Sequence, residues 1–191
     1  REWRARYPET KYGRETEAFL SRYRGSLEAA GVLVDDWACE QVEMRLGYAR
    51  RLTRRLRNVK PRLQDLGVAW EPWMGRIMLY YYYPEKLEGA KPWVRQLAEI
   101  LVACEQFEAY SNRRRGRDYY VRSRESLMEA FDYLASLQRE GVVSVAVLDA
   151  LRSLAAGGAF DRVLEQAQGR RLSRRDRSLL RGVGREQSHG G

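Results

Sequence analysis

The chain has 191 residues, 44% of them apolar, which is enough for one well-packed domain or for a larger domain with a small appendix. Its formal charge is +9, from 31 arginines, 4 lysines and 26 acidic residues. This charge favours an anionic partner, either nucleic acid, an acidic protein surface or an anionic membrane face. No run of about eighteen apolar residues is present, so no transmembrane helix is predicted.

Apolar residues recur at helical spacing from the start of the chain. The first predicted helix closes at Gly31 and carries Phe19, Leu20, Tyr23, Leu27 and Ala30. A longer helix follows, capped by Asp35 or Asp36, and Pro61 is expected to end or kink it because proline lacks the N–H and clashes with the preceding turn. Its apolar residues form a single stripe about six turns long: Ala38, Val42, Leu46, Ala49, Leu52, Leu56 and Val59.

Three further helices are predicted in the middle of the chain. A short one begins at Pro72, and Pro92 is suited to the first position of the next. That helix has one apolar face, made by Trp93, Leu97, Ile100, Leu101, Cys104 and Phe107. The sequence SLME at 126–129 has the form of a capping box, with Ser123 as a rival cap, and opens a helix that reaches Gly141.

Shorter helices follow to the end of the chain. Ser144 caps one that breaks at Gly157, and Ser173 with Asp176 opens a last turn. The sequence therefore predicts an all-α fold, a helical bundle with one long amphipathic helix and a small C-terminal helical end piece. The predicted parts are a main bundle over 1–141, the end piece over 142–182 and a disordered tail over 183–191.

The number and positions of the histidine and cysteines argue against a catalytic function. His189, the one histidine, lies three residues from the end, so no Ser-His, Cys-His or metal-histidine arrangement is available to the body of the chain. Cys39 and Cys104 have neither CxxC spacing nor a neighbouring histidine, and we expect two buried free thiols. We therefore expect no enzyme, no catalytic residue, no metal site and no cofactor.

The compartment is predicted from the cysteines and from the first residues. Two cysteines do not make a disulfide framework, which indicates an intracellular, reducing compartment. The chain starts REWRAR, without methionine and without a signal-peptide core. Removal of a mitochondrial or other organellar transit peptide and trimming of a fragment both explain such a start.

Positive charge is concentrated in three stretches. Eight bases and no acid lie between Met44 and Gln64, six arginines lie in 113–124 and seven lie in 170–185. On the long helix Arg50, Arg54 and Arg57 follow at spacings of four and three, opposite the apolar stripe. Such a ridge suits a phosphate backbone, although a solvated helix face has the same composition.

The candidate nucleic-acid contacts come from this ridge and from the connection over 113–124, which follows the helix that begins at Pro92. Arginine beside Tyr119 and Tyr120 in that connection suits stacking on single-stranded RNA, and it suits an acidic protein groove almost equally well. The predicted contacts are Arg50, Arg51, Arg54, Arg55, Arg57, Arg62, Arg113, Arg114, Arg115 and Arg117.

Aromatic residues gather between 70 and 93. Four consecutive tyrosines cannot all face one core, so at least one or two are expected at the surface or under a partner. A mixture of core and protein interface is the favoured interpretation, with a base-stacking platform as the alternative. The predicted protein interface consists of Trp70, Trp73, Tyr80, Tyr81, Tyr82 and Tyr83.

Three functions fit these observations. The first is a non-catalytic structural subunit of a ribonucleoprotein or other large assembly, which binds RNA or another polyanion and protein neighbours. The second is an accessory subunit of an organellar membrane complex, in the respiratory chain or ATP synthase, that contacts only proteins and lipid head groups. The third is a helix-turn-helix DNA-binding regulator, because three short helices end in the arginine-rich sequence SRRDRSLLR.

Overall fold

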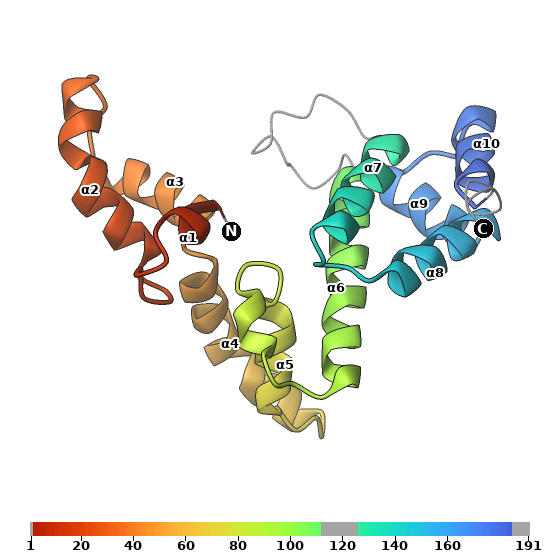
Figure 1. Cartoon of the computed structure of the whole chain (residues 1–191), viewed down its shortest axis with the longest axis horizontal. Coiled ribbons are helices and arrows are strands. Elements are labelled where there is room, and N and C mark those ends of the chain that lie inside the picture. The colour runs from red at the N-terminus through yellow and green to blue at the C-terminus, as the bar shows by residue number, and fades with distance from the viewer. Residues whose placement is uncertain (1, 112–125, 185–191) are drawn as a thin grey trace. The chain divides into compact units, whose positions relative to one another are not determined.

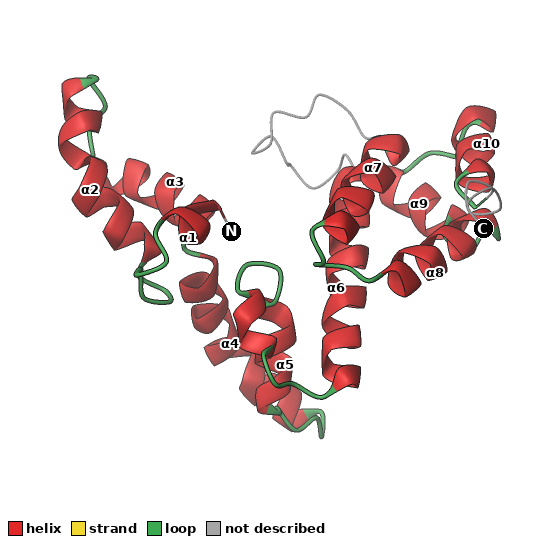
Figure 2. Ribbon diagram, viewed as in Figure 1, coloured by secondary structure: helices red, strands yellow, loops and turns green. Residues whose placement is uncertain are grey.

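The computed structural model describes residues 2–111 and 126–184, and 73% of these residues are helical (Figure 1 and Figure 2). They form ten α-helices and one short 3-10 helix, with no strand among them. The predicted all-α class is confirmed. Most of the tail predicted to be disordered, 185–191, lies outside the described residues.

The chain divides into two compact units, Arg1–Lys86 and Leu87–Gly191, called here the N-terminal and the C-terminal unit. The predicted boundary at 141 falls inside the C-terminal unit. The helices that follow residue 141 pack on those that precede it, since α8 (Val145–Ala156) contacts both α6 (Pro92–Ser111) and α7 (Leu127–Arg139). The end piece is therefore part of one core with α6 and α7.

The N-terminal unit contains five α-helices: α1 (Glu2–Arg6), α2 (Glu15–Ala29), α3 (Asp36–Leu46), α4 (Tyr48–Asp65) and α5 (Pro72–Leu79). The 3-10 helix Pro84–Leu87 lies at its end. α2 packs along α3 (Figure 1). The predicted cap of α3 is confirmed, because an Asp35 carboxylate oxygen accepts a hydrogen bond of 2.8 Å from the Ala38 N–H.

The predicted single helix of six turns is wrong, because the chain breaks at Gly47 into α3 and α4. Gly47 has φ −87° and ψ 32°, outside helical values. A Cβ at this position would lie 2.6 Å from Glu43 Cγ and 3.1 Å from Thr16 Oγ1, so only glycine allows α2, α3 and α4 to meet here.

α4 also passes through Pro61, which was expected to end or kink it. Proline removes one backbone donor, but the residues after it keep theirs, since the Leu66 N–H reaches the Arg62 carbonyl at 3.3 Å. The helix ends at Asp65, four residues later than predicted.

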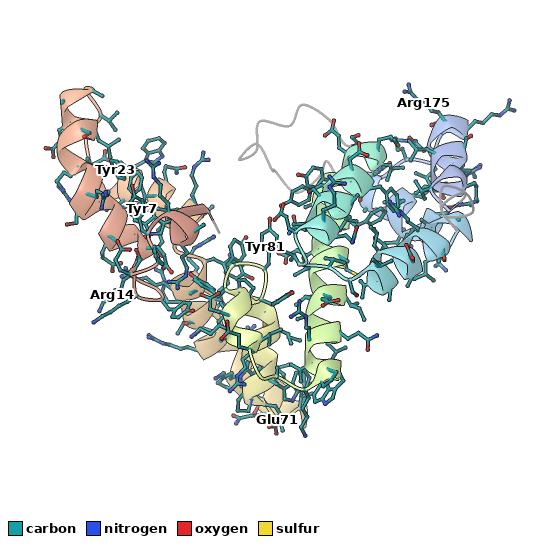
Figure 3. The ribbon with its side chains drawn as sticks, in the orientation of Figure 1. Tyr7, Arg14, Tyr23, Glu71, Tyr81 and Arg175 are labelled. Carbon is teal, nitrogen blue, oxygen red and sulfur yellow. The ribbon has the colours of Figure 1, made fainter. Side chains whose placement is uncertain are left out.

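An aromatic cluster joins α1 to α2. The ring centroid of Trp3 in α1 lies 5.7 Å from that of Phe19 and 6.4 Å from that of Tyr23, both in α2. The hydroxyls of Tyr7 and Tyr23 meet at 2.5 Å, and both side chains are labelled in Figure 3. Rings with polar ends therefore supply much of the contact between these two helices.

The C-terminal unit is built on α6 and α7, with α8, α9 (Asp161–Gln168) and α10 (Arg174–Gly182) around them. Ser126 caps α7 by accepting a hydrogen bond of 3.1 Å from the Glu129 N–H, and Ser173 with Asp176 forms a capping box on α10. Both predicted caps are confirmed. At the start of α8 the side chain of Ser144 makes no cap. The backbone N–H of Ser144 instead donates to the buried Glu99 carboxylate at 3.0 Å.

The apolar face predicted for α6 is mostly exposed. Trp93, Leu97, Ile100 and Leu101 lie at the surface, and Cys104 is exposed rather than buried as expected. The helix buries another face, made by Val94, Ala98, Val102, Ala103, Phe107 and Ala109. This face packs against α7, where the ring centroids of Phe107 and Phe131 are 5.5 Å apart.

Candidate polyanion-binding surface

The arginines of α4 form two rows along the side of the helix opposite its buried stripe, as the spacing predicted. Ala49 and Leu52 are buried on the other side. By helical geometry the first row consists of Arg50, Arg54 and Arg57, and the second consists of Arg51, Arg55 and Arg62. Their contacts, rather than their number, decide which of them are open to a ligand.

Two arginines of the first row are paired with acids from other helices. Arg50 Nη1 lies 2.7 Å from Glu17 Oε1 of α2, and Arg54 forms an ion pair with Glu43 of α3. The stretch from 44 to 64 contains no acid in sequence, but the fold brings two acids to it. The absence of acids from this stretch of the sequence therefore does not leave Arg50 and Arg54 unpaired.

Arg51 of the second row has a structural role. Its side chain is half-buried, and Nη2 donates a hydrogen bond of 2.8 Å to the Met44 carbonyl across the break between α3 and α4. The contact joins the two helices at the point where their backbone hydrogen bonds are interrupted. Arg51 is thus a poorer candidate for an external phosphate than predicted.

The remaining predicted arginines of the helix are exposed. Arg55, Arg57 and Arg62 have no acidic partner among the described residues. We call these three the α4 arginine surface, in which Arg57 belongs to the first row and Arg55 and Arg62 belong to the second. The adjacent Lys60 lies with Nζ 5.2 Å from the centroid of the Trp70 ring. The helix therefore presents its cations mainly in its C-terminal half.

Two hollows lie beside the paired arginines Arg50 and Arg54. One, of about 450 Å³, is lined by three arginines and by four acids, Glu17, Asp36, Glu40 and Glu43. The other, of about 470 Å³, has four cations in its lining and no acid: Arg50, Arg54, Arg57 and Lys86. Lys86 was not among the predicted residues, and only the fold brings it beside α4.

The arginines of the last basic stretch are paired more completely. Arg170, Arg177 and Arg181 pair with Asp176, Glu165 and Asp161, at 3.0, 3.0 and 2.6 Å. Hydrogen bonds from the Leu172 N–H and from Arg177 hold the pKa of Glu165 below its usual range. Arg171, Arg174 and Arg175 are exposed, and Arg175 extends away from α10 in Figure 3.

The residues of the predicted protein interface differ in how far their side chains are buried. Tyr80 and Tyr83 are 1% and 2% exposed, so they belong to the core of the N-terminal unit and not to its surface. Trp70, Trp73, Tyr81 and Tyr82 are half-buried, and Tyr82 stacks on Tyr48 with ring centroids 4.1 Å apart. The tyrosines follow the end of α5, where the chain turns, so their side chains diverge.

Tyr83 is fixed in the core by a carboxylate. Its hydroxyl donates to the buried Glu15 at 2.8 Å. Burial, followed by the hydrogen bond to Glu15 and its charge, raises the pKa of Tyr83 well above its ordinary value of 10.0. The phenol therefore stays protonated at physiological pH and donates to α2 from the residue that precedes the 3-10 helix.

Several predictions concern residues or features outside these contacts. Arg113, Arg114, Arg115 and Arg117 lie outside the described residues. In the part of the chain that is described, no group of three or more His, Cys, Asp or Glu side chains is placed to hold a metal ion. No described helix has both the length and the apolar character needed to cross a bilayer.

Comparison of the chain with family models, with curated proteins and with solved structures found no match.

Proposed function

We propose that this protein is a non-catalytic structural subunit of a ribonucleoprotein or another large assembly, and that it contacts RNA through the α4 arginine surface. The observation that carries the proposal is the exposure of Arg55, Arg57 and Arg62 without an acidic partner among the described residues. Guanidinium groups in this state are available as charged hydrogen-bond donors to phosphate. The expected binding tolerates any sequence and weakens with salt.

The experiment measures binding of a labelled single-stranded RNA by fluorescence anisotropy over a series of salt concentrations. The test variant is Arg55→Gln, Arg57→Gln, Arg62→Gln, which removes three charges without placing new acids beside Glu17 or Glu43. Each lost phosphate contact lowers the slope of log K against log salt by about 0.7 for a single strand, so we expect a decrease of roughly two.

The matched control removes three charges elsewhere. Arg76, Arg139 and Arg162 are exposed and each lies on a different helix. Arg76→Gln, Arg139→Gln, Arg162→Gln therefore has the same net charge as the test variant. Equal affinities and slopes for the two variants would rule out the α4 arginine surface as the RNA contact.

The second candidate function, an accessory subunit that contacts only proteins or lipid head groups, is supported by the exposed apolar residues. Leu33 and Trp37, at the turn between α2 and α3, are 76% and 67% exposed. Apolar side chains this open are typical of surfaces that a partner covers. In that case the wild-type protein would not bind RNA even at low salt.

A further inference from the structure

The hollow with no acid in its lining, which we call the Lys86 hollow, differs from the neighbouring hollow, which four acids line. It brings together α4, the turn at Tyr12 and the 3-10 helix that contains Lys86. Its volume of about 470 Å³ is within the range of sites for small ligands, about 300–1,000 Å³. It is therefore large enough for one phosphate group and its attached sugar.

Its net charge rests on two cations from different elements. Arg50 and Arg54 also line it, but Glu17 and Glu43 compensate their charges from the neighbouring hollow. Arg57 and Lys86 form no ion pair with a described residue. The walls include the apolar side chains Ala49 and Leu79, which lower the local dielectric and strengthen attraction for an anion.

The Lys86 ammonium is held in place by its neighbours. Its Nζ lies 3.7 Å from the centroid of the Tyr12 ring, and the guanidinium of Arg4 lies 4.0 Å from the same centroid. The Tyr12 and Tyr83 rings pack in a T-shaped arrangement, with their centroids 4.9 Å apart. The cation is thus attached to the core rather than to a flexible loop.

The nearest acid in sequence is already neutralised. Glu85 accepts hydrogen bonds from the Tyr12 hydroxyl and from Arg4 Nη2, the latter at 3.1 Å. Burial acts to raise the pKa of Glu85, but the bond from Tyr12 and the charge of Arg4 outweigh it and hold the pKa below its ordinary value. Glu85 is committed to Arg4 and Tyr12, which leaves Lys86 for an external anion.

From this arrangement we infer that the Lys86 hollow binds one phosphate group between Arg57 and Lys86. The inference rests on the proposed function in taking that phosphate from the backbone of the bound RNA, with a free phosphate compound as the other source of the same chemistry. Two cations already lie over the Tyr12 ring, so the ring is not offered to a base. Recognition is therefore of the phosphate and independent of base sequence.

The test measures RNA binding by full-length Lys86→Gln over the same salt series. We expect the slope of log K against log salt to decrease by about 0.7, one phosphate contact on a single strand. Lys86→Arg keeps the charge and the contact with the Tyr12 ring, so it should restore the slope. Lys91→Gln removes an exposed lysine of the C-terminal unit and should leave the slope unchanged.

Thermal unfolding of each variant separates lost binding from lost folding. If Lys86→Gln binds RNA as Lys91→Gln does, while the Arg55, Arg57, Arg62 variant binds weakly, the hollow is not a phosphate site and the proposed function stands. A slope that Lys86→Arg fails to restore would also overturn the inference, because the effect would then not come from the charge.

Calorimetric titration with inorganic pyrophosphate distinguishes the two sources of phosphate. If the wild-type chain binds RNA and pyrophosphate does not compete for the hollow, the phosphate comes from the RNA backbone. If the chain binds no RNA but binds pyrophosphate, and Lys86→Gln abolishes that binding, the hollow is a site for a free phosphate compound and the proposed function fails. Absence of binding to both would overturn the hollow and the proposed function together.

Discussion

The two units of the chain are stabilised in different ways. Over the described residues, twenty-two apolar side chains are buried in the C-terminal unit and only six in the N-terminal unit. The six are Tyr7, Ala38, Ala49, Leu52, Tyr80 and Tyr83, of which two are alanines and three carry a hydroxyl. Because apolar burial is the main favourable term in folding, the N-terminal unit has much less of it to offset the loss of chain entropy.

The ion pairing of the arginines also differs between one helix of each unit. Around α10 three arginines pair with acids of the same unit, whereas the C-terminal half of α4 leaves its arginines without such partners among the described residues. This difference is between the two helices, because Arg171, Arg174 and Arg175 are also exposed and both units have large apolar side chains at their surfaces. The small apolar core of the N-terminal unit suits a unit whose folding is completed by a partner.

The largest expected effect tests the difference between the two cores. Leu134 is 0% exposed and surrounded by the helices of the C-terminal unit, so Leu134→Ala should lower the free energy of unfolding by about 2–5 kcal/mol. Leu52, at 8% exposed in the smaller core, should cost less when it is replaced by alanine because its surroundings relax more easily.

Urea unfolding followed by circular dichroism measures the total effect, and hydrogen exchange measured segment by segment assigns it to a unit. Leu134→Ala should reduce amide protection in α6, α7 and α8 and leave that of α2 and α3 unchanged. Loss of protection in both units at once would show that they fold cooperatively, and the distinction between them would then fail.

An intermediate effect is expected at the break between α3 and α4. Gly47→Ala places a methyl group 2.6 Å from Glu43 Cγ and 2.9 Å from the Glu43 carbonyl oxygen, so we expect a loss of about 1–3 kcal/mol. Gly25 lies inside α2 with no atom within 4 Å of a Cβ, so Gly25→Ala should stabilise the chain by about 0.5–1 kcal/mol. Thermal unfolding of the two variants should therefore shift in opposite directions.

Local sequence patterns predicted the helices better than their partners. Caps at Asp35, Ser126 and Ser173 and the prolines at the start of α5 and α6 depend on a few neighbouring residues, and the structure confirms them. At Gly47 a Cβ would meet Glu43, four positions earlier, and Thr16, thirty-one positions earlier, and the continuous apolar stripe gave no sign of the break there.

The candidate site shows the same limit. The helical spacing placed the arginines of α4 opposite the buried stripe, but their acidic partners Glu17 and Glu43 come from other helices. The contribution of Lys86 depends on the turn after α5, which the sequence did not predict in detail. Charge in sequence therefore located a basic helix, whereas tertiary contacts determined which of its cations are open to a ligand.

The smallest expected effect concerns the paired arginines of the C-terminal unit. The pKa of Glu165 is held below its ordinary value of 4.5 by the Leu172 N–H and by Arg177. A carboxylate with a lowered pKa in the folded state stabilises the fold above its unfolded pKa, and that stabilisation is lost as the pH falls through the folded value. Glu165→Gln should therefore make the stability of the C-terminal unit less dependent on pH below about pH 5.

The measurement is the urea midpoint at several acidic pH values, with Glu88→Gln as the control. Glu88 is an exposed carboxylate of the same unit without a hydrogen bond or ion pair to a described side chain. Its replacement should leave the pH dependence parallel to that of the wild type, whereas Glu165→Gln should flatten it. If both variants follow the wild type, the ion pairs around α10 contribute little to the free energy of unfolding. The difference between α10 and α4 would then be one of side-chain positions and not of stability. RNA binding by Arg171, Arg174 and Arg175 would then need to be measured alongside that of the α4 arginine surface.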